Sequence, residues 1–351
     1  MKIYVLTIHN PNISMGPNMR LQGFLNKAES QKLEYILPKF PQKKNHSKIH
    51  TVLVLLRSLR DIIKNRKEID MIHVVTPPSY PGLIAVFAKK ILRLPYIVDI
   101  GDPYAENMAL IKNWTTKSIK FKILKRIDNL VYKNSSHLIL TSPELTKYIP
   151  SQIPHTTILT GIKSASSITP SPLPKNKKCL YLGQYGPLQN LEYIIKVFSA
   201  AIKKDPQIQL HIIGQGKCDL DSEKNIKFFS PIQSDAVPSL IEKYTCGIVS
   251  LDLKSTLDYA IPTKLLTYLC HGLPVFGTGG IATKTITREA NAGVITTKYN
   301  LHEDTDNLLR LLKDPEKLEN YSKNAVLFAK KNLSLESCSK KAQKIYKFHL
   351  Q

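Results

Sequence analysis

Short runs of β-branched and aromatic residues alternate with segments of helical period along almost the whole chain. Strands that read as continuous apolar runs, separated by helices, are typical of parallel sheets covered on both faces. The sequence therefore predicts an α/β protein. The expected strands lie near 2–7, 71–75, 96–100, 137–141, 179–183, 208–214, 247–252, 274–279 and 293–296. The expected helices lie near 51–66, 81–93, 115–134, 188–204, 235–243, 263–271, 301–312 and 315–331.

This alternation breaks once, between about 150 and 178, where the chain is rich in Pro, Ser and Thr and has no sustained period. We expect a doubly wound, Rossmann-like domain on each side of the break. Ligands of open α/β sheets bind beyond the carboxyl ends of the strands, so a cleft between two such domains is the expected site. The expected divisions are 1–155 for the N-terminal domain, 156–177 for the linker, 178–333 for the C-terminal domain and 334–351 for a terminal helix.

Composition and cysteine usage restrict the class of protein. The 351 residues are 42% hydrophobic and 22% charged, which is typical of a globular chain with room for two cores. The five cysteines are scattered without a C-x-x-C pair, which argues against a disulfide framework or a zinc site. The N-terminus reads as a first strand, and the longest apolar run, 81–88, is too short to span a bilayer. We expect a cytoplasmic protein without cofactor or metal.

The net charge of +23 is unevenly placed. Residues 1–150 hold 24 Lys and Arg against 10 Asp and Glu, whereas residues 201–300 hold 11 against 9. A basic N-terminal half implies an anionic partner, which is a phospholipid surface, a polyphosphate-bearing acceptor or nucleic acid. Nucleic acid has only charge in its favour, because no helix-turn-helix, zinc-finger, RNP-like or KH motif accompanies it.

The stretch IPTKLLTYLCHGLPVFGTGG (261–280) predicts a short helix over 263–271. Pro262 suits the start of a helix, and Gly272 suits the left-handed residue that ends one. Lys264 then lies in the first turn, where it opposes the helix dipole unless an anion binds between the two. Phosphate is the expected anion. The alternative is a solvated lysine on an ordinary surface helix.

Three other turns that follow strands contain glycine. Gly183 and Gly186 follow the first of these strands, Gly214 and Gly216 follow the second, and GTGG (277–280) closes the third. Glycine lets the backbone approach a ligand closely, so three such turns at one sheet edge predict a nucleotide cradle.

With these motifs in the order and spacing seen here, the chain resembles the C-terminal half of GT-B glycosyltransferases, in particular the retaining family 4 enzymes that use nucleotide sugars. The resemblance covers about 100 residues (181–280). The N-terminal half fits more loosely, chiefly through LRLPYIVDIGDPYAE (92–106). The resemblance implies an N-terminal acceptor domain, a C-terminal nucleotide-sugar domain, and a terminal helix that crosses back to the first domain.

The chain departs from that family at four positions. The family commonly has an arginine and a lysine that bind the diphosphate, and this chain has Gln184 and Gln189 at those positions. The family also commonly has two glutamates eight residues apart, and this chain has Tyr259 and Thr267 there. A branch similar to transferases for bacterial polysaccharide amino sugars tolerates such changes, which implies that Lys264 takes over the diphosphate contact. The implied nucleotide-sugar residues are Gly183, Gln184, Gly186, Gln189, Gly214, Gly216, Pro262, Thr263, Leu265 and Thr267.

The resemblance implies a UDP-, GDP- or dTDP-sugar as donor. Breaking the sugar–phosphate bond puts negative charge on the departing diphosphate, which a helix N-terminus, backbone N–H groups and Lys264 can stabilise without a metal. We therefore interpret the acidic run Asp219–Asp221 as a solvated turn rather than a metal site.

In the N-terminal half, Asp99, Asp102 and Glu106 follow a buried strand. A carboxylate there can orient or deprotonate an acceptor hydroxyl, and we assign this catalytic role to Asp102. The alternative is that Asp102 caps the following helix. The further acceptor or cleft candidates are His9, Gly16 and Arg20.

Residues 112–133 carry seven Lys or Arg and an apolar stripe through Ile119, Ile123, Ile127 and Leu130. Such a segment can lie on an anionic membrane surface, where lipid-linked acceptors are found. The alternative is that the stripe packs on the sheet and leaves the lysines solvated.

Together these patterns predict a transferase that moves a sugar from a nucleotide sugar to an acceptor in cell-envelope polysaccharide or glycoconjugate assembly. A saccharide or a lipid-linked sugar is the expected acceptor, at the inner face of the membrane. The departures at Gln184, Tyr259 and Thr267 leave one alternative, a GT-B-shaped subunit that has lost donor binding and acts as partner or scaffold of an active transferase.

Overall fold

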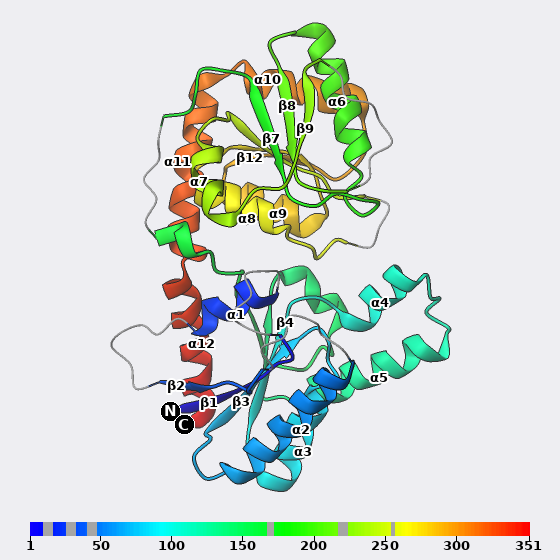
Figure 1. The fold of residues 1–351 in the computed structure, drawn as a ribbon, viewed down its shortest axis with the longest axis vertical. Coiled ribbons are helices and arrows are strands. Elements are labelled where there is room, and N and C mark those ends of the chain that lie inside the picture. Colours follow the sequence, from blue (N-terminus) through cyan, green and yellow to red (C-terminus); the bar gives the residue numbers. More distant parts are fainter. Residues whose placement is uncertain (10–16, 26–32, 41–47, 167–171, 217–223, 254–256) are drawn as a thin grey trace. The chain divides into compact units, whose positions relative to one another are not determined.

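The computed structural model describes residues 1–9, 17–25, 33–40, 48–166, 172–216, 224–253 and 257–351. The chain divides into two compact units. The first unit is Met1–Gly161 together with Leu335–Gln351, and the second is Ile162–Ser334 (Figure 1). The predicted residues Gly16 and Asp219–Asp221 lie outside the described residues.

The first unit is built on a six-stranded parallel sheet in the order β2-β1-β3-β4-β5-β6. Parallel strands need crossover connections, and helices provide most of them. Strands β1, β3 and β4 are almost completely buried, which explains their continuous apolar sequences. The strands are β1 (Lys2–Leu6), β2 (Glu34–Ile36), β3 (Met71–Thr76), β4 (Tyr96–Ile100), β5 (His137–Leu140) and β6 (His155–Thr157).

Two groups of helices pack within this unit (Figure 1). Helix α1 (Pro17–Leu25) contacts α12 (Leu335–Leu350), which buries Cys338, Ala342 and Tyr346 against the core. Helix α3 (Gly82–Leu92) contacts α2 (Lys48–Lys64) and α5 (Ile119–Lys133), and α4 (Tyr104–Lys112) contacts α5. The 3-10 helix η1 (Pro143–Tyr148) follows β5.

The second unit repeats this plan with the strand order β12-β11-β10-β7-β8-β9, again all parallel. Its strands are β7 (Lys178–Leu182), β8 (Gln209–Ile213), β9 (Ile226–Phe229), β10 (Cys246–Val249), β11 (Val275–Thr278) and β12 (Gly293–Thr296). Its helices are η2 (Lys163–Ser166), α6 (Leu191–Lys204), η3 (Ser234–Ala236), α7 (Val237–Ile241), α8 (Thr263–Cys270), α9 (Ile281–Glu289), α10 (Leu301–Leu312) and α11 (Pro315–Asn332).

The core of the second unit follows from amphipathic sequences. Helix α6 buries Ile194, Ile195 and Phe198 at helical spacing, and α10 packs Leu308 and Leu312 beside them. These side chains meet the apolar faces of β7, β8 and β10. Long periodic segments of this kind are the elements that the sequence located most closely.

Several elements were not expected. The edge strands β2 and β6 are only three residues long, too short for a period to be read. Because β6 includes Thr156 and Thr157, the expected linker of 156–177 begins inside the first unit's sheet. The helix expected over 115–134 starts at Ile119 instead, because Asn113 adopts a left-handed conformation and Ser118 caps α5.

None of the described helices has the length and apolar character that crossing a bilayer requires. The four described cysteines, Cys179, Cys246, Cys270 and Cys338, are buried, and none of them forms a disulfide with another described cysteine. Among the described residues, no cluster of three or more His, Cys, Asp or Glu side chains is placed to bind a metal ion.

Candidate functional site

Two glycine turns lie against each other at the carboxyl ends of β7 and β8. Gly183 has a φ of 103° and donates its N–H to the carbonyl of Ile213 at 2.8 Å. A Cβ on Gly214 would overlap the carbonyl oxygen of Gly183, and one on Gly216 would overlap that of Tyr185. Gly214 and Gly216 are therefore required by the close approach of two backbones, and Gly183 by its positive φ, whereas Gly186 has room for a Cβ.

Helix α8 begins and ends close to where the sequence predicts. Pro262 is its N-cap, one position before the first helical residue, and its carbonyl accepts from Leu265 N–H at 2.9 Å. Gly272 follows the helix with a φ of 67°. Leu265, expected near the ligand, has its side chain fully buried in the core. Thr263 is exposed at the first helical position.

A tyrosine fixes α8 to the carboxyl end of β7. The Tyr268 hydroxyl accepts from Leu182 N–H at 2.9 Å and donates to the Leu180 carbonyl at 3.0 Å. Gly247 on β10 leaves room for the ring, since a Cβ there would lie 2.5 Å from it. These two bonds hold α8 against the end of β7, which the first glycine turn follows.

Lys264 is the most unusual side chain at this edge. Its Nζ is buried, lies 3.3 Å from the centroid of the Tyr181 ring, and has no hydrogen-bond partner among the described residues. Burial lowers the pKa of Lys264 well below its ordinary value. The Tyr181 hydroxyl donates to the Gln184 carbonyl at 2.9 Å, which connects this pair to the glycine turn. The alternative of a solvated surface lysine is wrong.

The remaining predicted donor-side residues offer no charge. Gln184 is exposed, and Gln189 is half-buried with its N–H bonded to the Gly186 carbonyl at 2.9 Å. Thr267 donates its hydroxyl to the Thr263 carbonyl at 3.0 Å, and Tyr259 is buried. The two positions that hold glutamates in the family thus present no free carboxylate.

A small pocket lies beyond β10 and β11, and the predicted GTGG turn contributes Gly279 and Gly280 to its lining. Asp252, Leu253, Asp258, Gly279, Gly280 and Thr297 are among its lining residues. Tyr299 orders one wall, since its hydroxyl donates to Asp252 at 2.9 Å and accepts from Leu253 N–H at 2.8 Å. The signal for Asp252 was its place just beyond the end of a buried strand.

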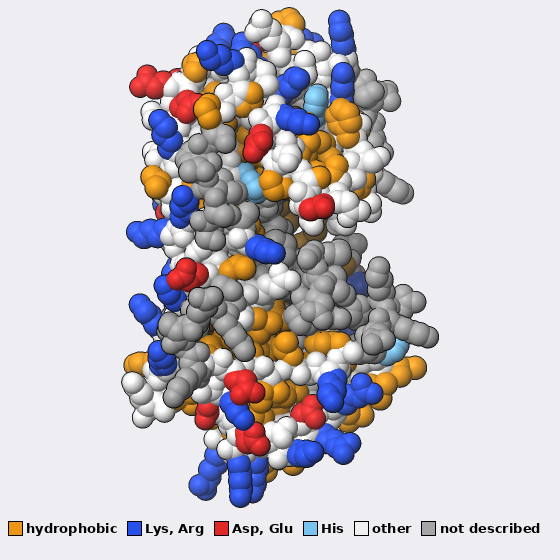
Figure 2. Space-filling model, turned by 60° about the vertical axis from the view of Figure 1, so that its left-hand side comes forward, with side chains coloured by type: hydrophobic (Ala, Val, Ile, Leu, Met, Phe, Trp, Pro, Cys, Tyr) orange, Lys and Arg blue, Asp and Glu red, His pale blue; other side chains and the backbone are white. Residues whose placement is uncertain are grey.

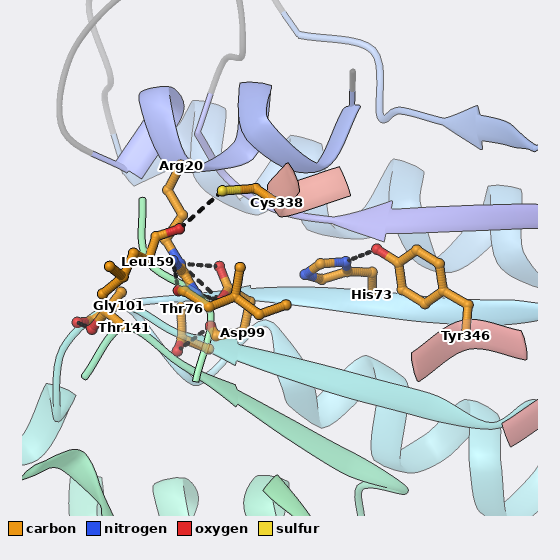
Figure 3. A network of polar contacts seen from close by, with 10 residues as sticks. Arg20, His73, Thr76, Asp99, Gly101, Thr141, Leu159, Cys338 and Tyr346 are labelled. Atoms are coloured by element: carbon orange, nitrogen blue, oxygen red, sulfur yellow. Dashed lines mark hydrogen bonds and ion pairs between the residues drawn. The ribbon is translucent and has the colours of Figure 1, made fainter. Parts of the chain in front are cut away.

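In the first unit, Arg20 and Asp99 come together as a buried ion pair (Figure 3). Arg20 Nε lies 2.8 and 2.9 Å from the two carboxylate oxygens of Asp99, and Arg20 Nη1 donates to the Ile158 carbonyl at 2.7 Å. Arg20 is 4% exposed and Asp99 is fully buried. We expected both residues to face the acceptor or the cleft. The pair instead connects α1 to β4 inside the core.

Neighbouring polar contacts in Figure 3 place α12 on the same sheet. His73 Nδ1 and the Tyr346 hydroxyl lie 2.6 Å apart, and Cys338 Sγ lies 3.3 Å from the Leu159 carbonyl. Burial lowers the pKa of His73 to about 3, with the Arg20 charge as a second cause, so this ring is neutral at physiological pH. The network supports the fold.

The other acceptor-side candidates lie at the carboxyl ends of the strands. Asp102 follows β4, and burial raises its pKa, an effect that the Arg20 charge opposes. His9 follows β1 and places Nε2 2.7 Å from the Pro77 carbonyl, beyond β3. Glu106 is paired with Lys125 at 2.6 Å. Asp102 is not the N-cap of α4, because Pro103 holds that position.

Sequence reasoning missed Asp128 on α5. One of its oxygens accepts from Ala105 N–H at 3.1 Å, and the other is buried without a partner among the described residues. Burial raises the pKa of Asp128 to about 6. Asp128 lies 23 residues beyond Ala105 in the sequence, so no local pattern predicted this contact.

Comparison with known families finds a similarity that is confined to the second unit. Residues 167–327 match the family described as Glycosyl transferases group 1. The match covers most of the second unit and none of the described strands of the first. The match covers the glycine turns, Lys264 and the Asp252 pocket, so the predicted identification as a glycosyltransferase is confirmed. A search of curated protein sequences finds no match to the chain.

Solved structures similar to the whole chain are glycosyltransferases of the GT-B kind. Sucrose-phosphate synthase from Thermosynechococcus elongatus has a TM-score of 0.72 at 14% identity, over 99% of this chain and 98% of that one. Anabaena HepE in complex with UDP has a TM-score of 0.71 at 14% identity, over 99% of each chain. WaaG, a glycosyltransferase involved in lipopolysaccharide biosynthesis, has 0.64 at 15% identity, over 99% of each chain. These likenesses confirm the predicted two-domain α/β fold.

Proposed function

We propose that the chain moves a sugar from a nucleoside diphosphate sugar to a saccharide or lipid-linked acceptor, and that Lys264 binds the diphosphate. The observation that carries this proposal is the buried ammonium of Lys264, which has no hydrogen-bond acceptor among the described residues. A buried charge without a partner costs several kcal/mol, and a bound anion removes that cost. The first turn of α8 adds unpaired backbone N–H groups beside it.

The chemistry of the reaction suits these groups. As the bond between the anomeric carbon and the phosphate oxygen breaks, negative charge grows on the departing diphosphate. Donors that are already fixed in place stabilise this charge more in the transition state than in the ground state. Lys264 held over Tyr181, the α8 N-terminus and the glycine turns are such donors. We propose that they replace a metal ion in this role, and that the reaction proceeds with retention.

Asp102 is the proposed acceptor-side carboxylate. It follows a buried strand at the carboxyl edge of the first sheet, and its raised pKa makes it a better proton acceptor than an exposed aspartate. His9 and Pro77 belong to the same edge. Asp99, Arg20 and Glu106 are taken up in ion pairs and have no part in this proposal.

We propose the acceptor class from the basic first unit and from the solved structures that are similar to the chain. WaaG is involved in lipopolysaccharide biosynthesis, and HepE has been solved with UDP-glucose. We therefore propose UDP-sugars as the first donors to try, and cell-envelope polysaccharide or glycoconjugate assembly, on the cytoplasmic side of the membrane, as the setting. Figure 2 shows one face on which Lys and Arg project among hydrophobic side chains, with several Asp and Glu between them. The net charge of +23 agrees with an anionic acceptor.

A thermal-shift panel with UDP, GDP, ADP, dTDP and CMP tests the proposal. A ligand that binds the folded state alone raises the melting temperature. We expect one nucleoside diphosphate to stabilise the wild type and Lys196→Ala, an exposed lysine on α6, but not Lys264→Met. If no nucleotide stabilises the wild type, the scaffold alternative takes the place of the transferase. If the Lys264→Met variant still responds, the assigned role of Lys264 is refuted.

A further inference from the structure

Three helices of the first unit present apolar side chains to solvent. Of the 20 large hydrophobic side chains that are exposed within the described ranges, 11 belong to α2, α3 and α5. These helices lie side by side, because α3 contacts both of the others (Figure 1). Scattered exposed apolar residues are ordinary, but a gathering of this size on one layer marks an interaction surface.

On α2 the exposed side chains form a helical stripe. Ile49, Val52, Leu53, Leu56 and Ile63 are 72%, 53%, 41%, 58% and 45% exposed. Their spacing places them on one side of the helix. The opposite side, which is buried in the unit, consists of Val54, Ser58 and Ile62. The broader apolar face of α2 therefore points away from the core.

The neighbouring helices continue this surface. On α3, Leu83, Phe87 and Ile91 are exposed at positions four residues apart, with Ile91 at 64%. On α5, Ile119 and Ile123 are 76% and 50% exposed. The alternative that the α5 stripe packs on the sheet is therefore wrong for these two residues. We refer to the outward sides of α2, α3 and α5 as the three-helix face.

Charge on these helices is almost entirely of one sign. Their sequences hold 11 Lys and Arg against 2 Asp, and one of the two aspartates, Asp128, is buried. Arg57, Arg60, Lys90, Lys122 and Arg126 are exposed among the apolar side chains. Long basic side chains can extend past an apolar surface to reach phosphates, as they do in helices that lie in a lipid interface.

We propose that the three-helix face docks on an anionic lipid bilayer. The apolar stripes enter the boundary between headgroups and acyl chains, while the Lys and Arg side chains contact the lipid phosphates. The occupant follows from charge complementarity, because a face with apolar stripes and almost no acidic residues matches an anionic interface. This differs from the prediction for 112–133, since α5 forms only one part of a surface in which α2 has the most exposed apolar residues. The proposal does not rest on the transferase activity.

Flotation of the full chain with vesicles tests the docking surface. We compare vesicles of phosphatidylcholine alone with vesicles of equal parts phosphatidylcholine and phosphatidylglycerol. The wild type should float with the anionic vesicles, and less so as salt is raised. Leu56→Ser with Ile91→Ser should weaken binding about tenfold or more, and Arg60→Gln about fivefold. The matched control, Leu327→Ser with Phe348→Ser on α11 and α12, should bind within about twofold of wild type.

Three results would overturn the proposal. One is failure to bind anionic vesicles, and another is equal binding to neutral and anionic vesicles. The third is a dimer in sedimentation velocity, without vesicles, that Leu56→Ser with Ile91→Ser abolishes, because the face would then bind a second copy of the chain. All substituted side chains are exposed, so we expect unchanged melting temperatures, and a melting curve for each variant verifies that it is folded.

Discussion

Both units are built on a six-stranded parallel sheet, and each contains a buried cation. The two cations differ in their hydrogen bonding. In the first unit, Arg20 donates to both oxygens of Asp99 and to the Ile158 carbonyl. In the second, Lys264 Nζ is buried over Tyr181 without a hydrogen-bond acceptor among the described residues. A buried charge that the protein satisfies stabilises the fold, whereas one that it leaves unsatisfied indicates an anionic ligand. The comparison thus separates a structural cation from a proposed binding one.

The largest expected effect tests the structural half of this comparison. Arg20→Met leaves the Asp99 carboxylate buried without its partner, which should cost about 3–5 kcal/mol of unfolding free energy. Hydrogen exchange should show the loss in residues of the first unit. Arg20→Met combined with Asp99→Leu should regain most of it, because no charge is then left unpaired. A single variant within about 1 kcal/mol of wild type would contradict the structural role.

The binding half of the comparison predicts opposite effects on stability and affinity. Lys264→Met removes a buried charge and leaves an unbranched side chain of similar length. The ligand-free protein should therefore melt at a higher temperature than wild type. The affinity for the nucleoside diphosphate found in the panel should fall about a hundredfold, on the order of 3 kcal/mol. Calorimetric titration measures the affinity. A lower melting temperature together with unchanged affinity would show that Lys264 is structural, like Arg20.

A glycine substitution tests whether the turns beside Lys264 depend on close backbone contact. In Gly214→Ala the new Cβ would overlap the Gly183 carbonyl oxygen, so we expect a loss of about 2 kcal/mol and weaker nucleotide binding. Gly186→Ala is the matched control, because its Cβ would lie 3.7 Å from the nearest atom, Gln189 Oε1. Urea denaturation measures the stability of both variants. Equal effects of the two changes would refute the argument from close approach.

The most gradual of the expected effects is the pH dependence of the first unit. Asp128 titrates at about 6 in the folded protein and near its ordinary value, about 4, when unfolded. Between these values the folded state binds more protons, so stability should fall as pH rises, by at most about 1 kcal/mol per pH unit. Asp128→Asn should flatten this part of the curve, which urea denaturation between pH 4 and pH 7 measures. A slope shared by wild type and variant would assign the dependence to other groups.

The sequence predicted the fold well where its signals are local. Apolar runs and amphipathic periods gave α10 and β12 within the observed bounds, because strong period and burial agree there. Pro262 and Gly272 gave the ends of α8, since their backbone preferences act without tertiary help. Helix α9 was missed because two of its four buried residues are threonine, which weakens the apolar period.

The site was predicted less completely, and the reason lies in contacts between distant residues. The sequence indicated Lys264, the glycine turns and Asp102, which all follow strands of a parallel sheet. It gave no sign that Arg20 and Asp99, 79 residues apart, would pair, nor that Tyr299 would order Asp252. Leu265 was expected near the ligand because it adjoins Lys264, but the helix turns its side chain into the core.

By itself, the sequence determined the parallel α/β plan, the glycine-rich turns and the place of Lys264 in the first turn of a helix, since periodicity and backbone conformation are properties of neighbouring residues. Tertiary structure alone decided which charges are satisfied and which faces are covered. It placed Asp99 against Arg20, put the Tyr181 ring under Lys264, and left the apolar stripe of α2 exposed. The physical reason is that burial depends on what the rest of the chain packs against each side chain.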